Sequence, residues 1–390
     1  MKICIFAKNL PIHLRGGMEI HIQDLVNGLV KRGHKVTIIT APHPEGIKKE
    51  EKENLTIYYL KSKPKYLREK FYKESAELFE KINKQEKFDI VHSQSTLACG
   101  YAKYCKKKIP IVVTLHGTSL NDIKSLLKPK SLSRFFLMLP FYLKTRLIDE
   151  PILFGKADKI ITVSKELEED IKIQHKIPEE KLIVIPNGVD TNKFKPLDIS
   201  DLKEKLNIKD EKVIVSCGTI RKQKGFHLLI KILPEISRKQ KVKLIIIGTG
   251  PYLENLKRMS IQYKVADKVL FIGSIPHEKL PIYYNLADIF VFVTLLKEAF
   301  PLVVIEAMAC GRPVIASKIG GIPTAVENYR DGILIEPGNL KELKEKILEV
   351  LRDEGLSKKL KKNARQKAIG KFSLDKMVDD TVKVYQELTQ

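Results

Sequence analysis

The sequence predicts an α/β protein made of two doubly wound domains, each a parallel sheet with helices on both faces. Short apolar runs alternate with longer amphipathic stretches along almost the whole chain, a pattern typical of repeated strand–helix units. The alternation stops once and then starts again, which divides the chain in two. A length of 390 residues also suits two domains of ordinary size better than a single core.

The first half contains short β-branched-rich runs bounded by turn or polar residues, and we expect these to be strands. They are Ile3–Ala7, Lys35–Thr40, Leu55–Leu60, Asp89–His92, Ile111–Leu115, Lys159–Val163 and Leu182–Ile185. Several are almost continuously apolar, as a parallel sheet buried on both faces requires. Helical periodicity occupies Gly17–Lys31, Tyr66–Lys84 and Lys165–Gln174.

The break falls in Pro186–Lys212, a stretch of weak periodicity with Pro186, Gly188 and Pro196. The strands expected beyond it are Val213–Cys217, Lys243–Ile247, Val269–Ile272, Ile289–Val293, Val314–Ala316 and Ile333–Ile335. Helical stretches between them include Gly225–Arg238, Tyr252–Gln262 and Leu302–Ala309. We therefore expect domains at residues 1–190 and 191–372. The final helical stretch, 373–390, has no strand of its own and is a candidate to cross back to the first domain.

Composition narrows the class of protein. Lys and Arg exceed Asp and Glu by 23, which favours an anionic partner: nucleic acid, a phosphorylated ligand or an anionic membrane surface. A generally Lys-rich surface, as in a heat-adapted protein, explains the charge equally well. The five cysteines show no metal-ligand spacing, and no secretory signal or membrane-spanning run is visible, so we expect a cytoplasmic protein.

The most informative motif is the pair Glu298 and Glu306, which lie just after a predicted strand and within the helix that follows it. In a doubly wound protein the ligand is expected at the carboxyl ends of the strands, here in a cleft between the two domains. A carboxylate in such a loop can accept hydrogen bonds from sugar hydroxyls, and one further into the helix can bind both hydroxyls of a ribose. The N–H groups around Phe300, Pro301, Leu302 and Val303 open the helix and can face a phosphate. The alternative is that Glu298 caps the helix and Glu306 is a surface charge.

Three further motifs follow predicted strands of the first half. Gly16 and Gly17 open the first helix and allow close approach to a phosphate or a sugar, although a simple tight turn has the same pattern. His116 follows a strand and precedes a glycine, a position from which it can contact sugar hydroxyls; a lone histidine is also often structural. Asn187 lies in Pro186–Asp190, which also suits a hinge between domains.

Two cations and a glycine occupy similar places in the second half. Arg221 and Lys224 follow the strand Val213–Cys217 and can neutralise the diphosphate of a leaving nucleotide, unless they merely form a basic loop. Gly250 follows the next strand, where the backbone can approach a nucleotide.

Together these motifs resemble glycosyltransferase family 4, whose members have the GT-B fold. The resemblance covers nearly the whole chain and is strongest over Glu298–Ala316. It implies retaining transfer from a nucleotide-diphosphate sugar, with no cofactor and no divalent metal. His116, Lys224 and Glu298 would act at the reacting centre. The donor would be bound by Gly16, Gly17, Asn187, Arg221, Lys224, Gly250, Glu298, Phe300, Pro301, Leu302, Val303 and Glu306.

Two positions depart from the family pattern. Thr219 stands where an Arg is usual, and Arg221 is a candidate to replace it. Pro301 stands where a Gly is common, which removes one N–H, although Pro is tolerated in the first turn of a helix.

The acceptor is less well defined. Basic residues are frequent in Lys61–Lys73 and in Leu120–Arg146, and the second stretch surrounds the apolar run Phe135–Leu143. Basic and apolar residues together are typical of an interfacial helix, which would suit a lipid-linked acceptor and a protein peripheral on the membrane. The alternative is that the run packs in the first domain's core.

Other functions remain open from the residues alone. A nucleotide-sugar epimerase or a glycan phosphorylase can use the same architecture, but no lysine is marked as a Schiff-base former. The charge would also suit a nucleic-acid-binding protein, yet no zinc finger, RNA-binding aromatic signature or helix-turn-helix spacing is present. We therefore expect no nucleic-acid partner.

Overall fold

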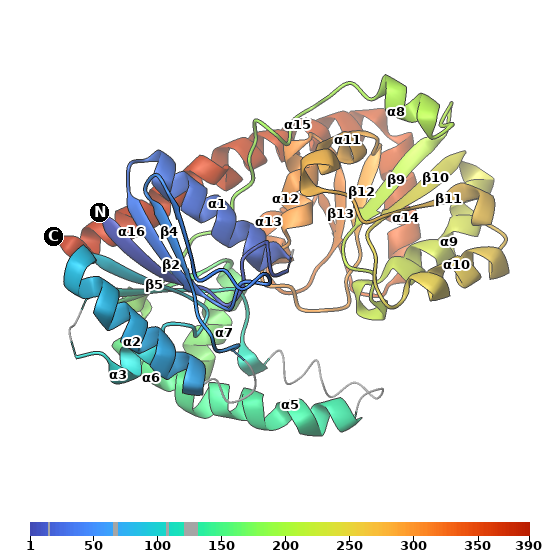
Figure 1. Cartoon of the computed structure of the whole chain (residues 1–390). Helices are drawn as coiled ribbons and strands as arrows, with labels where there is room; N and C mark the ends of the chain where they lie inside the picture. The colour runs from blue at the N-terminus through green and yellow to red at the C-terminus, as the bar shows by residue number, and fades with distance from the viewer. Residues whose placement is uncertain (15, 65–68, 107–108, 121–131) are drawn as a thin grey trace. The chain divides into compact units, whose positions relative to one another are not determined.

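The computed structural model of the chain describes residues 1–14, 16–64, 69–106, 109–120 and 132–390, which form two compact units (Figure 1). The first unit contains Met1–Gly188 together with Leu374–Gln390, and the second contains Val189–Ser373. The chain passes between the units at 188–189 and again at 373–374.

The first unit is built on one sheet with the strand order β3-β4-β2-β1-β5-β6-β7-β8. Its strands are β1 (Lys2–Phe6), β2 (Lys35–Thr40), β3 (Lys49–Lys52), β4 (Leu55–Tyr59), β5 (Ile90–Gln94), β6 (Ile111–Leu115), β7 (Lys159–Thr162) and β8 (Leu182–Val184). All described pairs are parallel except β3 with β4, and the chain reverses its winding direction between β1 and β5.

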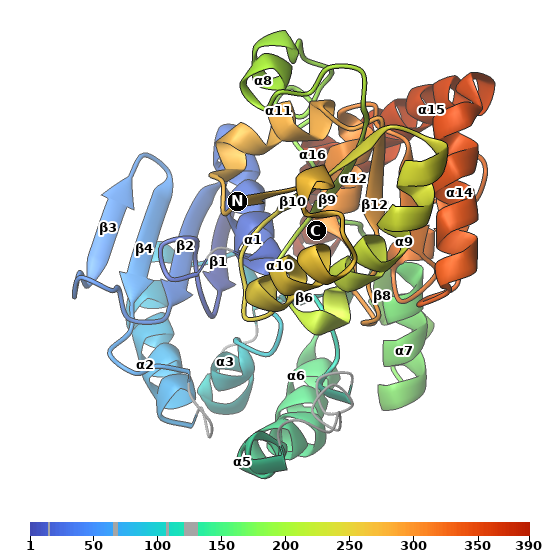
Figure 2. The same ribbon diagram turned by 90° about the vertical axis from the view of Figure 1, so that its right-hand side faces the viewer.

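Helices cover both faces of this sheet (Figures 1 and 2). The helical elements of the first unit are α1 (Gly17–Lys31), α2 (Glu69–Glu86), α3 (Cys99–Tyr104), α5 (Leu132–Lys144), the π-helix η1 (Thr145–Asp149), α6 (Glu150–Lys156), α7 (Lys165–His175), the 3₁₀ turn η2 (Glu179–Lys181) and α16 (Leu374–Thr389). α1 and α16 lie side by side on one face, while α2, α3 and α6 lie on the other. A Cβ on Gly28 of α1 would lie 2.4 Å from Val378 of α16, so this close packing requires glycine.

The sequence prediction missed β3. Its residues, Lys49 to Lys52, are all charged and have low β-propensity, so no apolar pattern marks them. The strand forms through antiparallel pairing with β4, at the outer edge of the sheet. Charged residues are common on such edges, where they discourage pairing with other chains.

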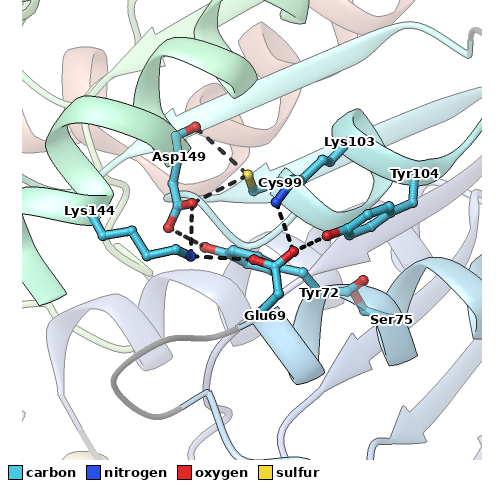
Figure 3. A network of polar contacts seen from close by, with 8 residues as sticks. All are labelled: Glu69, Tyr72, Ser75, Cys99, Lys103, Tyr104, Lys144 and Asp149. Atoms are coloured by element: carbon cyan, nitrogen blue, oxygen red, sulfur yellow. Dashed lines mark hydrogen bonds and ion pairs between the residues drawn. The ribbon is translucent and has the colours of Figure 1, made fainter.

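A network of polar contacts joins α2, α3 and the segment from α5 through η1 (Figure 3). The Asp149 carboxylate accepts a hydrogen bond from the Tyr72 hydroxyl at 3.1 Å and lies 3.3 Å from Lys144 Nζ. Glu69 pairs with Lys103 at 2.7 Å and also contacts the Tyr104 hydroxyl. Burial, with Asp149 nearby, raises the pKa of the Cys99 thiol in this network to about 12, so it is not a nucleophile at neutral pH.

The second unit contains a parallel sheet with the order β11-β10-β9-β12-β13-β14. Its strands are β9 (Lys212–Cys217), β10 (Val242–Ile247), β11 (Val269–Gly273), β12 (Ile289–Phe292), β13 (Val314–Ser317) and β14 (Ile333–Ile335). Numbered within the unit this order is 3-2-1-4-5-6, the doubly wound arrangement of dinucleotide-binding folds. The predicted fold class of two doubly wound α/β sheets is therefore confirmed.

The helices of the second unit also lie on both faces of the sheet. They are α8 (Ser200–Lys205), α9 (Phe226–Lys239), α10 (Leu253–Gln262), α11 (Leu280–Asn285), α12 (Leu302–Ala309), α13 (Ile322–Ala325), α14 (Leu340–Arg352) and α15 (Glu354–Phe372), with the 3₁₀ turns η3 (Lys222–Lys224), η4 (Ala266–Lys268) and η5 (His277–Lys279). α9 contacts α10 and α14, and α12 contacts α11 and α15. Apolar side chains of α9, α10 and α14 pack with those of the strands into one core.

Candidate active site

In the second unit, two loops leave the sheet at the point where its winding reverses. One follows β9 and the other follows β12, and these two strands are neighbours. The Leu295 N–H donates to the Gln223 carbonyl at 2.8 Å and ties the loops together. A Cβ on Gly225 would lie 1.8 Å from the Val293 carbonyl oxygen, and φ there is +77°, so only glycine fits. Open α/β sheets bind their ligands at this position.

Lys224 and Glu298 meet between these loops. The Lys224 ammonium lies 2.6 Å from Glu298 Oε1, although the residues are 74 positions apart in sequence. The Thr294 hydroxyl donates to the same oxygen at 3.1 Å, and the ammonium also lies 5.7 Å from the centre of the Phe292 ring. Both charged side chains keep about a fifth of their surface exposed, at 21% and 20%. A cation and an anion are thus held side by side and open to a ligand.

Glu306 is buried, with 4% of its surface exposed. Its two oxygens each receive a hydrogen bond at 2.7 Å, one from His277 Nε2 and one from the Tyr284 hydroxyl. Burial, together with Cys217 and Glu306, raises the pKa of Tyr284 well above its usual range, so the hydroxyl remains a donor. The alternative of a surface charge at Glu306 is therefore wrong.

The start of α12 lies between the two glutamates in sequence. Phe300 is buried against the ring of Phe372 at 5.5 Å between centroids, and Pro301 is the residue that caps the helix. Because α12 begins at Leu302, followed by Val303, its first N–H groups have no acceptor within the helix. Glu298 is held by the next loop, since the Gly321 N–H donates to its carbonyl at 2.7 Å.

Two further predicted donor-binding residues of this unit, Arg221 and Gly250, lie in the loops after β9 and β10. The side chain of Arg221 is exposed, and no ion pair joins it to a carboxylate in the described part of the chain. Gly250 packs against the loop after β9, where a Cβ would lie 2.3 Å from the Ile220 carbonyl oxygen. This close backbone contact explains why residue 250 is a glycine without any contact to a ligand.

In the first unit, two glycines at the start of α1 and two histidines, His21 and His116, lie near the carboxyl ends of the strands. Gly16 caps α1 and Gly17 begins it, and a Cβ on Gly16 would lie 2.7 Å from the carboxylate of Glu19. His116 follows β6, and its Nε2 lies 2.9 Å from Gln94 Oε1 at the end of β5. The His21 ring of α1 contacts the His116 ring edge-on, with centroids 4.6 Å apart.

His21, His116 and His92, which lies in β5, are uncharged at neutral pH. Burial lowers the pKa of His21 to about 4 and that of His92 to about 3. Burial, with His21 and His92 nearby, also holds the pKa of His116 well below its usual range. Neutral rings at this edge can exchange hydrogen bonds with hydroxyl groups.

Asn187 lies in the first unit, near His21. The two side chains are each 5% exposed, and neither His21 ring nitrogen nor Asn187 Oδ1 has a hydrogen-bond partner among the residues described. Asn187 lies close enough to raise the pKa of His21 against the larger effect of burial, but no hydrogen bond of normal geometry joins them. Buried polar atoms without a hydrogen-bond partner are uncommon in proteins.

Sequence reasoning missed His21, Gln94, His277 and Tyr284. His277 lies in η5 and Tyr284 in α11, outside every motif that the sequence indicates. Gln94 could have been predicted from the sequence, because His92 and Gln94 place polar side chains two residues apart in a strand that is otherwise suited to burial. No comparable pattern marks His21 within the amphipathic helix α1.

The basic stretches of the first unit are only partly described. Residues 65–68 of Lys61–Lys73 and residues 121–131 of Leu120–Arg146 lie outside the described residues. Of the run Phe135–Leu143, the side chains from Met138 to Leu143 are described, and each is partly or well exposed. In the described parts of the chain, no helix is both long enough and apolar enough to cross a membrane.

Comparison with known proteins places both units in one class. The family model for glycosyl transferases group 1 matches residues 198–367, and that for glycosyltransferase family 4 matches residues 15–193. An uncharacterized glycosyltransferase of Methanocaldococcus jannaschii is 30% identical, over 99% of this chain and 98% of the relative.

Solved structures agree with that class. Sucrose-phosphate synthase of Thermosynechococcus elongatus superposes with a TM-score of 0.82 at 25% identity, covering 99% of this chain and 98% of the other. HepE of Anabaena, solved in complex with UDP-glucose, has the same fold, with a TM-score of 0.75 at 21% identity over 99% of this chain and 100% of the other. The fold is the GT-B fold of glycosyltransferases. The chain belongs to glycosyltransferase family 4, and its activity is that of a glycosyltransferase.

Proposed function

We propose that the protein transfers a hexose-type sugar from a nucleotide-diphosphate sugar to a hydroxyl acceptor, with retention of the anomeric configuration. The observation that carries the proposal is the Lys224–Glu298 pair, held at 2.6 Å where the second sheet reverses its winding. A diphosphate sugar offers a polyanion for the ammonium beside hydroxyls for the carboxylate. HepE, which has the same fold, binds UDP-glucose, and this supports a nucleotide-sugar donor.

Each group has a part in donor binding under this proposal. Lys224 contacts the diphosphate, Glu298 accepts hydrogen bonds from hydroxyls of the transferred sugar, and the first N–H groups of α12 face a phosphate. Glu306 accepts from the ribose hydroxyls, because each of its oxygens retains a lone pair after bonding His277 or Tyr284. Arg221, Gly16, Gly17, Asn187 and Gly250 remain proposed donor-binding residues.

The proposed reaction takes place on one face of the sugar. The acceptor oxygen forms its bond to the anomeric carbon while the bond from that carbon to the diphosphate oxygen breaks, and the acceptor proton passes to the departing phosphate. Negative charge grows on the diphosphate during this step, so the fixed Lys224 ammonium stabilises the transition state more than the ground state. His116 contacts the transferred sugar through a neutral ring.

We also propose that no divalent metal takes part, because Lys224 and the start of α12 supply positive charge to the diphosphate. Turnover is then unchanged in excess EDTA. A loss of turnover in EDTA that Mg²⁺ or Mn²⁺ restores would contradict this part of the mechanism.

A thermal-shift screen against UDP-, GDP- and ADP-sugars tests the donor class. A donor at one hundred times its dissociation constant adds about 2.7 kcal/mol to the stability of the protein that binds it. We expect a clear shift with at least one donor, and a smaller shift for the same donor in the Lys224→Ala variant. Absence of a shift with every donor class would refute the proposed function.

We propose a lipid-linked acceptor and peripheral association with an anionic membrane. Leu143, Leu147 and Ile148 are 41%, 69% and 45% exposed, at the end of α5 and in η1, beside Lys144 and Arg146. Exposed apolar side chains suit the interface of a bilayer, and the net charge of +23 favours an anionic one. We expect co-sedimentation with vesicles containing anionic lipid, weakened by Leu147→Ser. Absence of binding to such vesicles at low salt would rule out this acceptor class.

A further inference from the structure

One face of the first unit's sheet carries polar side chains where a doubly covered sheet is normally apolar. His92 and Gln94 are two residues apart on β5, so both side chains stand on the same face. Thr114 on β6 is the register partner of Gln94, and His116 follows it by two residues. His92, Gln94 and Thr114 are only 0%, 1% and 2% exposed. Polar groups at such depth destabilise the fold unless they form hydrogen bonds within the protein.

These side chains form one continuous chain of hydrogen bonds with Tyr385 of α16. The Tyr385 hydroxyl lies 2.5 Å from His92 Nδ1, and the Thr114 hydroxyl lies 2.7 Å from His92 Nε2. The Gln94 amide lies between the two histidines, with its nitrogen 3.4 Å from His92 Nε2 and its oxygen 2.9 Å from His116 Nε2. The chain of bonds therefore runs from α16 across the sheet to the histidine at its carboxyl edge.

We infer that Gln94 is a positioning residue, which fixes the orientation and the proton of the His116 ring through its amide oxygen. The inference rests on the proposed function, in which His116 contacts the transferred sugar. Because an amide oxygen can only accept, His116 carries its proton on Nε2 and leaves Nδ1 bare. That nitrogen is then an acceptor for a sugar hydroxyl.

His92 fixes the Gln94 amide in turn. The single lone pair of its Nε2 accepts from the Thr114 hydroxyl at 2.7 Å and, more weakly, from the Gln94 nitrogen at 3.4 Å, which leaves the Gln94 oxygen turned toward His116. His92 then carries its own proton on Nδ1 and donates it to Tyr385. Because the Gln94 nitrogen can only donate and its oxygen can only accept, the proton position on His92 sets the orientation of the amide and thereby the proton position on His116.

The groups around His116 explain why residue 94 is an amide. His21 of α1 contacts the ring directly, and His92 stands behind Gln94 on β5. Burial and the two histidines keep His116 uncharged. A carboxylate at position 94 would stabilise the protonated ring and raise the pKa of His116, which would abolish the bare Nδ1 acceptor.

The pKa of His116 tests this coupling without any assay of sugar transfer. Histidines labelled at the ring carbon are titrated by NMR in the wild type, in Gln94→Glu and in Gln23→Glu, with the His116 signal assigned through His116→Asn. Gln23 is an exposed residue of α1, so Gln23→Glu adds a carboxylate to the same unit away from the chain of bonds. We expect the pKa of His116 to rise to 6.5 or above, roughly the value of a free histidine, in Gln94→Glu alone. An unchanged titration in Gln94→Glu, or an equal rise in Gln23→Glu, would overturn the inference.

Kinetics provide the second measurement. Gln94→Met keeps the length of the side chain but removes both polar ends. We expect kcat to fall by roughly tenfold, the effect of losing about 1.4 kcal/mol in the transition state, with the KM for the donor little changed. In Gln94→Glu we expect activity that falls below about pH 6.5 and recovers in alkali. Wild-type kcat in Gln94→Met would overturn the positioning role. If instead no donor shifts the melting of the wild type, the proposed function fails, while the NMR result still decides the coupling.

Discussion

At the carboxyl edge of the first unit the polar side chains are neutral, whereas at the same edge of the second unit they are charged. His21, His92 and His116 have pKa values lowered by burial and hold no charge at pH 7. In the second unit, Lys224 and Glu298 form an ion pair that stays partly open to solvent. The first edge thus suits hydroxyls and the second suits a phosphorylated group. Two domains of one fold class thus carry edges of different charge, because different side chains stand at and near the carboxyl ends of their strands.

We expect the largest effect from removing Lys224, the cation at the carboxyl edge of the second unit's sheet. Lys224→Ala removes the group that we propose to stabilise the leaving diphosphate, and we expect kcat at saturating donor to fall by roughly a thousandfold. Lys222→Ala, an exposed lysine of the same turn, is the matched control and should keep normal turnover. Normal turnover in Lys224→Ala would show that the Lys224–Glu298 pair has no part in catalysis.

The neutral histidines of the first unit should make the stability of the protein sensitive to acid. The folded protein binds protons at His21 and His92 only near pH 4 and pH 3, whereas an unfolded histidine binds one near pH 6.5. The unfolded state therefore binds more protons below about pH 6.5, so the free energy of unfolding decreases as the pH falls from there toward 4. The shift at His21 alone corresponds to about 3 kcal/mol.

Urea unfolding at several pH values measures this dependence. We expect the slope of the free energy of unfolding between pH 6 and pH 4.5 to be smaller by about one proton in His21→Phe. An identical slope in the variant and the wild type would show that His21 is not held neutral by the fold.

The buried glutamate of the charged edge gives a smaller effect. Glu306→Gln keeps the shape of the side chain, but an amide nitrogen cannot accept from Tyr284, His277 or a ribose hydroxyl. We expect the KM for the donor to rise by about tenfold, equivalent to about 1.4 kcal/mol, with a lesser change in kcat. Glu327→Gln, at an exposed site of the same unit, serves as the control. A fall in kcat with unchanged KM would argue against a ribose contact.

The smallest effect concerns the far end of the hydrogen-bond chain. Tyr385→Phe removes the hydroxyl that contacts His92, and we expect a loss of about 1 kcal/mol of stability in urea unfolding. Tyr283→Phe changes a partly exposed tyrosine and should leave stability unaltered. Equal stability of Tyr385→Phe and the wild type would indicate that His92 finds another partner.

The two edges also differ in how far their residues could be predicted. Glu298 and Glu306 lie within one contiguous motif, and the strand–helix pattern around them has a strong apolar signal. Their partners are far away in sequence, since Lys224 is 74 residues from Glu298 and His277 is 29 from Glu306. Pairing of that kind depends on strand order, which a single sequence does not determine.

At the neutral edge, prediction reached His116 but not the residues that hold it. Gln94, His92 and Tyr385 come from β5 and α16, and only the register of β5 with β6 and the return of α16 bring them together. Strand β3 was missed for a different reason, because its residues are all charged and its pairing partner alone makes it a strand. Patterns of burial were therefore predictable, whereas contacts between distant elements were not.

The return of α16 to the first unit has a consequence for synthesis on the ribosome. The second unit is one continuous segment, Val189–Ser373, and every strand of its sheet is available once that segment has emerged. The core of the first unit includes Met377, Val378, Val384 and Tyr385, so it stays incomplete until residues 374–390 are made. The part synthesised second is thus the part that can finish folding first, while the face of the first sheet beside α1 stays only partly covered until α16 is made.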